Sequence, residues 1–398
     1  MQLTEVKTKQ DASDFIRINV DINRNDPNYI RPLDKDVDDV FDPAKNKTFR
    51  FGEVSRWLLR SAEGKLIGRI AAFVNKKYKN KGDDVPVGGI GFFDCINNQE
   101  AADMLFDVAR HWLLQRGMEA MDGPINFGER DRWWGLIVEG NEPPLYCMNY
   151  NPPYYRELFE KYGFKNFFNQ ICFALHAKYL LQQKFFDRHQ ELAKDPNYTA
   201  QHIKKDQLKK FVKDFTVVYN KAWAGHGGLK QLDEKVVAKM FQSMKPVMDE
   251  KICWFAYYKD EPIAIWINLP DLNQWFKRLN GQFSLFHKLK FLWLKSTVKS
   301  KKFVGLVFGV VPEFQGKGVD SYIIIEGCKV IQGLTFQDNQ VSLGHLLYDD
   351  YEMQWIGEFN PKMINVAENL GTYRSRRLTT YRYLFDRAKE FKRHPVLE

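Results

Sequence analysis

The stretch of sequence that decides the fold is Val310-Val311-Pro312-Glu313-Phe314-Gln315-Gly316-Lys317-Gly318-Val319-Asp320. An apolar strand over 303–311 leads into it, and a helix over 321–330 follows. Glycines let backbone N–H groups turn toward one point, and the positive end of the helix dipole faces the same point. The stretch therefore predicts a phosphate-binding loop, although strand–glycine–helix segments also occur as plain turns. It is too short for a Walker A loop and lacks the G-x-G-x-x-G dinucleotide pattern.

The composition indicates a folded chain with two domains of ordinary size. Of its 398 residues 44% are hydrophobic and 15% aromatic, which is enough for packed cores. The net charge of +9 suits an anionic ligand, but most of it is expected on solvated surface, with one concentration over 277–302. The five cysteines form no C-x-x-C pair and predict no metal site. Free thiols, a polar N-terminus and no apolar run of membrane length lead us to expect a cytoplasmic protein.

An internal repeat predicts the architecture. The strand, turn and strand over 57–70 match those over 253–267, and the strand and helix that begin the chain match those after Tyr198 at the same offset. Further matches pair the strands 89–96 with 303–311, 119–127 with 353–359, and 169–175 with 377–385, the last pair closing each half. In each half an Asn-Pro pair, at Asn151 and at Asn360, marks the start of a helix. Each half therefore predicts a mixed α/β sheet flanked by helices.

The loop and this order of elements resemble the GNAT superfamily of acyl-CoA-dependent N-acyltransferases. The family loop has the pattern Gln/Arg-x-x-Gly-x-Gly/Ala, which Gln315 and Gly318 match and Asp320 does not. The resemblance implies two tandem GNAT-like domains, 1–180 and 181–398, each with a mostly antiparallel mixed sheet flanked by helices. The N-terminal half has no glycine at the loop position, 93–100, and carries acidic residues there. We therefore expect the cofactor only in the C-terminal half.

In GNAT enzymes the strand before the loop splays from its neighbour and binds the pantetheine arm. By resemblance, the backbone of 308–311 would bind pantetheine and the amides of 315–319 the pyrophosphate of acetyl-CoA or another acyl-CoA. Asn360 would contact pantetheine, cap its helix, or do both. Lys317 would neutralise a phosphate or remain a solvated surface residue. The cofactor-binding residues that the resemblance implies are Phe308, Val310, Val311, Gln315, Gly316, Lys317, Gly318, Val319, Ser321 and Asn360.

Attack of an amine on a thioester needs a base, donors for the oxyanion and an acid for the thiolate. The family's usual tyrosine acid is absent, because its position holds Ala367. Tyr373 is nearby in sequence and is a candidate acid. Glu358 lies on the strand beside the expected thioester and is a candidate base, or an outward-facing residue of an alternating strand. His226, in a glycine-rich loop, is a weaker candidate.

Two insertions are expected to choose the substrate. The segment 271–302 mixes aromatic residues and leucines with lysines, and packed helices or a lid are favoured over a membrane-surface helix or a partner site. The segment 128–150 contains Trp133 and Trp134 and predicts either acceptor recognition between the domains or a small satellite core.

These features predict an acyl-CoA-dependent N-acyltransferase, most simply an N-acetyltransferase, whose acceptor is a small amine, an amino acid or a peptide amine. One alternative is a non-catalytic acyl-CoA-binding or sensor protein. Another is a Fem-type aminoacyl transferase, for which the sequence has no RNA-binding signature or coiled-coil arm, so a nucleic acid partner is not expected.

Overall fold

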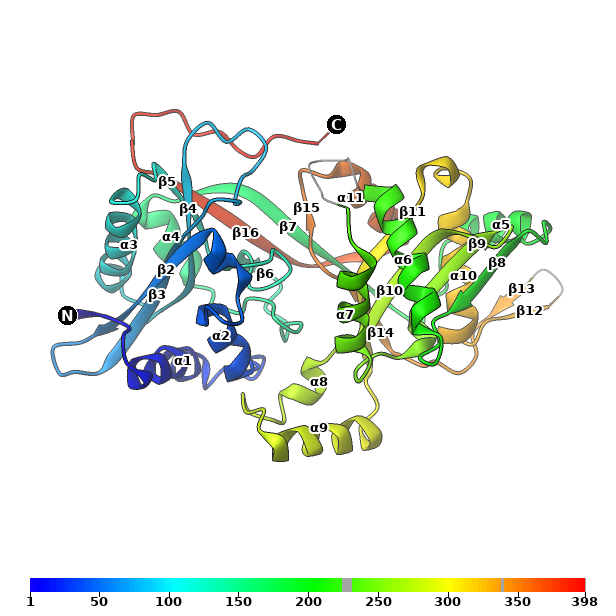
Figure 1. Cartoon of the computed structure of the whole chain (residues 1–398), viewed down its shortest axis with the longest axis horizontal. Helices are drawn as coiled ribbons and strands as arrows, with labels where there is room; N and C mark the ends of the chain where they lie inside the picture. The colour runs from blue at the N-terminus through cyan, green and yellow to red at the C-terminus, as the bar shows by residue number, and fades with distance from the viewer. Residues whose placement is uncertain (224–230, 338–339, 398) are drawn as a thin grey trace.

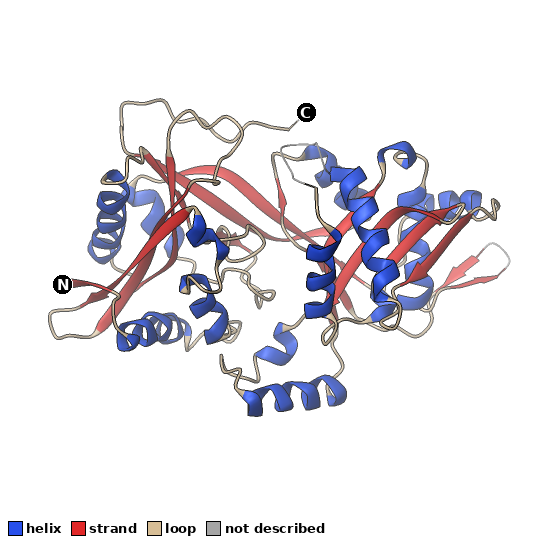
Figure 2. Ribbon diagram, in the orientation of Figure 1, coloured by secondary structure: helices blue, strands red, loops and turns tan. Residues whose placement is uncertain are grey.

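The computed structural model describes residues 1–223, 231–337 and 340–397. Over these residues the strands form a 14-stranded, mostly antiparallel mixed sheet and a separate two-stranded hairpin. Helices flank the large sheet, so the predicted mixed α/β architecture is confirmed. Figures 1 and 2 show two lobes joined by two long strands, β7 (Lys165–His176) and β16 (Tyr373–Leu384).

The remaining elements follow the order that the repeat predicts. The N-terminal half contains β1 (Gln2–Glu5), α1 (Lys9–Asn23), α2 (Asp34–Phe41), β2 (Gly52–Arg60), β3 (Leu66–Asn75), β4 (Val87–Cys95), α3 (Gln99–Leu114), β5 (Ala120–Gly123), β6 (Leu136–Glu139) and α4 (Tyr155–Tyr162). The C-terminal half contains α5 (Gln183–Leu192), β8 (Tyr198–His202), α6 (Leu208–Trp223), α7 (Glu234–Met244), β9 (Trp254–Tyr258), β10 (Glu261–Pro270), α8 (Asn273–Phe276), α9 (Leu285–Thr297), β11 (Lys302–Val310), α10 (Val319–Ile331), β12 (Thr335–Gln337), β13 (Gln340–Ser342), β14 (Asp350–Met353), β15 (Ile356–Gly357) and α11 (Pro361–Asn369).

The two final strands are exchanged between the halves. The strand order is β1-β2-β3-β4-β5-β16-β7-β14-β11-β10-β9-β8, so β16 lies beside β5 and β7 lies beside β14. The expectation that each final strand closes its own half is therefore wrong. Both strands are long and mostly buried, and only tertiary pairing decides which edge each one joins. The expected strand 353–359 is also wrong, because the chain forms β14 and β15 in its place.

Two helices of the C-terminal half, α6 and α10, cover opposite faces of its sheet. Adjacent residues of a strand point to opposite faces. On β9, Phe255 packs against Phe211 of α6, with ring centroids 5.0 Å apart. Its neighbour Trp254 faces α10. Gly327 of α10 makes room for the rings of Trp254 and Trp266, because a Cβ there would contact both. The hydrophobic core of this half therefore lies on both sides of the sheet.

The sheet opens beside β11 because a β-bulge interrupts this strand. Val307 pairs with Ile267 of β10, whereas Gly305 pairs with the next residue of β10, so Leu306 is an extra residue. On the other edge, within the described residues, β11 pairs with β14 only as far as Gly305, and β15 pairs with β7 instead. Beyond Gly305 the backbone of β11 therefore faces a gap.

Candidate functional site

The gap beside β11 leads into a cavity of about 380 Å³. Tyr219 and Trp223 of α6 line it from one face of the sheet, and Ile324 and Cys328 of α10 from the other, so the cavity passes through the sheet. Trp223 comes close to β11 because Gly309 has no side chain: a Cβ there would lie 2.1 Å from the indole ring. The other lining residues are mostly apolar: Leu175, Ala177, Leu181, Trp266, Phe303, Gly305, Leu306, Val307, Phe308, Ile331, Gln332, Tyr351, Met353, Gln354, Trp355, Ile356, Met363, Val366, Ala367, Leu370 and Thr372.

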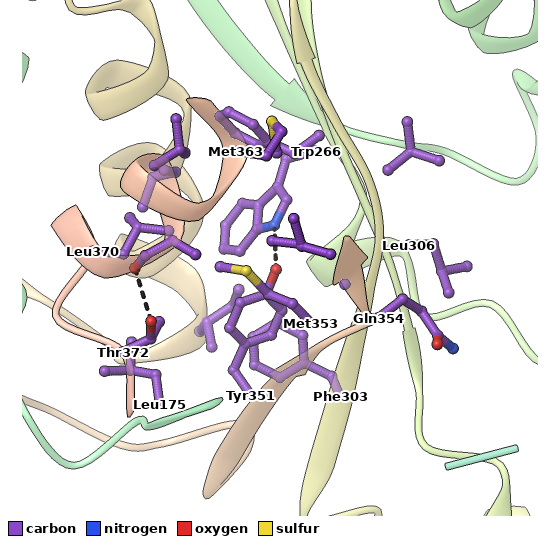
Figure 3. A pocket seen from close by; sticks show the side chains of 18 of the residues that line it. Leu175, Trp266, Phe303, Leu306, Tyr351, Met353, Gln354, Met363, Leu370 and Thr372 are labelled. Atoms are coloured by element: carbon purple, nitrogen blue, oxygen red, sulfur yellow. Dashed lines mark hydrogen bonds between the residues drawn. The ribbon is translucent and has the colours of Figure 1, made fainter. Parts of the chain in front are cut away.

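The polar groups of the lining are mostly engaged by the protein itself (Figure 3). The indole N–H of Trp266 donates to the Tyr351 hydroxyl at 3.4 Å. Burial raises the pKa of Tyr351 to about 12, so the hydroxyl is neutral at physiological pH. The Thr372 hydroxyl donates to the carbonyl of Ala367 at 2.8 Å. A cavity with this lining suits an apolar ligand.

The glycine loop between β11 and α10 keeps backbone donors available. Gly316 and Gly318 have φ values of 72° and 84°, which favour glycine, and Gly318 is the N-cap of α10. The side chain of Gln315 donates to the carbonyl of Val310 at 2.9 Å, and its backbone N–H donates to Pro312. Among the hydrogen bonds of the described residues, none uses the backbone N–H groups of 316–319. Four consecutive donors thus remain for a ligand at the positive end of α10.

Two cations lie at this loop, one of which the sequence did not reveal. Lys317 is exposed, with its Nζ 5.4 Å from the ring centroid of Phe314. Arg188 of α5 is also exposed, and its Cβ would be 3.5 Å from a Cβ on Gly318. No motif surrounds Arg188, and only the packing of α5 against α10 brings it to the loop. Ser321, by contrast, is fully buried.

Among the remaining expected cofactor residues, only Phe308 lines the cavity in the part of the chain that the structure describes. Val310 pairs with Ala264 of β10. Val311 donates its N–H to β10 as well. Asn360 caps α11, because its side-chain oxygen accepts from the N–H of Met363 at 3.3 Å. The N-cap alternative for Asn360 is confirmed, and its contact with a ligand stays a prediction.

The candidate catalytic residues lie outside the wall of the cavity. The Glu358 carboxylate accepts from the backbone N–H and the side chain of Asn169, at 2.9 and 2.8 Å, and pairs with Arg393. Tyr373 is half-exposed at the start of β16, where its ring lies 5.3 Å from that of His176. Their catalytic roles stay predictions. His226 lies outside the described residues.

In the N-terminal half, protein fills the space that stays open beside β11. Ile125, in the segment after β5, donates its N–H to the carbonyl of Ile90 in β4 at 2.7 Å. A Cβ on Gly91 would lie 1.9 Å from the Ile125 oxygen, so the two backbones are in direct contact. At the position that matches the glycine loop, Asp94 forms a buried ion pair with Arg69 at 2.7 Å.

The two insertions differ from each other in how they pack. Trp133 and Trp134 are buried, and Trp133 packs on Phe92 with ring centroids 5.4 Å apart, as in the satellite-core alternative. In the segment 271–302, Trp275 and Phe276 are buried together with Leu33 of the N-terminal half. The expected packing is wrong for the outer face of α9, where large apolar side chains are exposed: Leu285, Phe286, Leu289, Leu292 and Trp293.

Solved structures with the same architecture identify the fold. A tandem GNAT protein from the clavulanic acid biosynthesis pathway aligns with a TM-score of 0.51 at 11% identity, over 96% of this chain and 99% of that one. The chain has a tandem GNAT fold. The GCN5-related glucosamine N-acetyltransferase region of a fungal multi-domain GH3 β-N-acetylglucosaminidase aligns with a TM-score of 0.52 at 12% identity, over 96% of this chain and 38% of that one.

Two curated proteins are similar to this chain in sequence. The bacterial ceramide synthase of Caulobacter vibrioides is 26% identical over 374 residues, covering 93% of this chain and 94% of the relative. Protein YghO of Escherichia coli is 23% identical over 375 residues, covering 94% and 93%. No family model matches the chain.

The described residues contain neither a membrane-spanning helix nor a cluster of metal ligands. In this part of the chain no helix has the length and apolar content needed to cross a bilayer. The same residues contain no group of three or more His, Cys, Asp or Glu side chains placed to hold a metal ion.

Proposed function

We propose that this protein is an acyl-CoA-dependent N-acyltransferase that transfers a long acyl chain to an amine. The apolar cavity at the gap beside β11 carries the proposal. Its volume of about 380 Å³ is on the order of ten times the roughly 30 Å³ that a water molecule occupies in the liquid, and a methylene group is of similar size. An acetyl group and the end of the pantetheine arm together would leave much of this apolar space empty, so the cavity favours a longer acyl thioester over the N-acetyltransferase expected from the sequence.

The cofactor would bind along β11 and at the glycine loop. Beyond Gly305 the strand edge has no β14 partner, so the amides of a pantetheine arm can pair with it as an added strand would. The free N–H groups of 316–319 and the helix dipole of α10 suit the pyrophosphate. Asp320 stands in the first turn of α10, and the positive charges of Arg188 and Lys317 offset its repulsion of an anion.

The reaction would form a C–N bond and break the C–S bond of the thioester. The acceptor ammonium first loses a proton to a base, and its nitrogen then attacks the carbonyl carbon. As the C–S bond breaks, the nitrogen gives up a second proton to leave the neutral amide, and the thiolate of CoA takes up one proton. The bulge at Leu306 supports a place for the developing oxyanion, because the backbone groups of a bulged residue are not tied into the ladder. Glu358 as the base and Tyr373 as the acid are part of the proposal.

The acceptor would enter between the two halves. Trp355 lines the cavity and also packs against a hydrophobic cluster that includes Leu145 and Met148 of the 128–150 segment. A ceramide is the amide of a fatty acid with a long-chain amino alcohol, and the Caulobacter relative is named a ceramide synthase. We therefore propose a long-chain amino alcohol as the acceptor, with its amine directed to the gap and the 128–150 segment contributing to its recognition.

The test is an assay of thiol release with acyl-CoA thioesters from two to eighteen carbons, each against a long-chain amino alcohol, serine and a short peptide. We expect turnover with chains of about twelve carbons or more and the amino alcohol, with the amide identified by mass spectrometry. Titration calorimetry with free CoA measures cofactor binding separately. Replacing Glu358 by Gln and Tyr373 by Phe tests their roles, with the pH profile of kcat as the readout.

Three outcomes would contradict the proposal. Turnover of acetyl-CoA alone would restore the short-chain prediction. CoA binding without thiol release for any amine would favour the sensor. No CoA binding at all would remove the cofactor site. Unchanged pH profiles in both variants would remove Glu358 and Tyr373 from the mechanism and leave the rest of the proposal standing.

A further inference from the structure

Helix α9 has an apolar face that no other described part of the chain covers. The exposed fractions are 75% for Leu285, 71% for Phe286, 60% for Leu289, 53% for Leu292 and 60% for Trp293. At 3.6 residues per turn these positions share one side of the helix. Buried Phe291 and Leu294 lie on the other side, packed against α8. The helix is therefore apolar on two sides, and only one of them is used by the fold.

Basic residues surround this exposed face. By the same helical spacing, Lys288 and Lys295 border it on one side and Lys290 on the other. The whole segment 271–302 contains eight basic residues and a single acidic one, Asp271, so it carries the larger part of the chain's net charge of +9. An apolar face bordered by lysines is complementary to a surface that is apolar inside and anionic outside.

The fold holds α9 in a fixed position at the edge of the molecule. Figure 1 shows α8 and α9 extending from the sheet, beside the N-terminal half. The N–H of Asp34 donates to the carbonyl of Gly281 at 2.7 Å, and the side chain of Asn273 donates to the carbonyl of Pro144 at 2.7 Å. Both bonds link the α8–α9 segment to the N-terminal half, so its outer face is presented without rearrangement.

We propose that the outer face of α9 binds the surface of an anionic phospholipid bilayer. The leucines, Phe286 and Trp293 enter the boundary between headgroups and acyl chains, and the lysines contact lipid phosphates. Trp is well suited to this depth because its ring is apolar and its N–H is polar. Membrane binding of this kind goes beyond the proposed acyl transfer, and it brings the cavity to the phase in which long acyl chains and lipid amines are found.

The test is flotation of the full chain with vesicles, without any substrate. Vesicles with about a third phosphatidylglycerol in phosphatidylcholine should carry the protein at low salt, and pure phosphatidylcholine should carry it at least tenfold less because the electrostatic attraction is lost. The double variant Phe286→Ser, Trp293→Ser should bind the anionic vesicles at least tenfold less. The variant Lys288→Gln, Lys290→Gln should bind them several-fold less and lose most of its salt dependence.

A matched control separates this face from apolar exposure in general. Val236 and Met240 are 55% and 39% exposed on α7, one helical turn apart, and replacing both by Ser should leave vesicle binding unchanged. The proposal is overturned if the wild type does not float with anionic vesicles, or if the Phe286, Trp293 variant floats like the wild type. It is equally overturned if the wild type ignores vesicles but forms a dimer that this variant abolishes, as measured by sedimentation. None of these results depends on whether acyl transfer occurs.

Discussion

Replacing Cys328 by Phe should shorten the acyl chain that the protein accepts. Cys328 is buried on α10 and lines the cavity on the far side of the sheet from α6. Phe has five more side-chain heavy atoms than Cys and so takes the space of about four methylene groups. At about 0.8 kcal/mol per buried methylene, the longest chains lose about 3 kcal/mol of binding. Since about 1.4 kcal/mol is tenfold, this is a loss of about a hundredfold.

The assay compares two acyl-CoA thioesters on the same variant. The ratio of kcat/KM for dodecanoyl-CoA to that for butyryl-CoA should fall about a hundredfold in Cys328→Phe, because only the longer chain reaches the new ring. In the control Cys328→Ala, which removes the sulfur and adds no atom to the cavity, the ratio should stay within about twofold. Thermal unfolding and CoA titration establish that both variants are folded and bind cofactor. An unchanged ratio in folded Cys328→Phe would refute the assignment of the acyl chain to this cavity.

Three further predictions concern the loop and the buried charges. Gly316→Ala should weaken CoA binding about tenfold in calorimetry, because Ala is strained at a φ of 72°. The control Gly64→Ala places the same kind of strain, at a φ of 80°, on a distant turn and should bind CoA like the wild type. Equal Kd values for the two variants would contradict a role for the loop. Glu352→Gln should lower the free energy of unfolding by about 3–5 kcal/mol in urea at pH 7, because it breaks a buried pair with Arg376. Burial opposes ionisation, but Arg376 holds the pKa of Glu352 below 4.5, so this difference should shrink as pH falls below that value; a constant difference would count against the ion pair. Burial raises the pKa of Asp271 from 3.8 to about 6, so the stability of the fold falls as pH rises through this interval. Asp271→Asn should therefore be more stable than the wild type at pH 7, by up to about 3 kcal/mol, and no more stable at pH 3. Thermal melts at both pH values test this.

The site could be predicted only where its chemistry is local in sequence. The loop at 315–319 was found because positive-φ glycines and a following helix leave a pattern within ten residues. The cavity left none, since its wall comes from α6, β11, α10, β14 and α11, whose side chains meet only after folding. Arg188 was missed for the same reason. Sequence proximity also proposed Glu358 and Tyr373, whose side chains lie outside the cavity wall, and their catalytic roles stay predictions.

The sequence by itself determined the doubled α/β plan, because apolar periodicity and turn residues act over a few residues and recur in both halves. It also predicted a phosphate-binding loop at Gly316 and Gly318 and none at the matching position, 93–100, of the N-terminal half. Tertiary structure alone decided the exchange of β7 and β16, since the residues of a strand do not record which distant strand it pairs with. It decided the gap beyond Gly305 and the exposure of Leu289 on α9 as well. Which of two apolar surfaces is covered depends on the packing of distant elements, and periodicity within one helix does not record it.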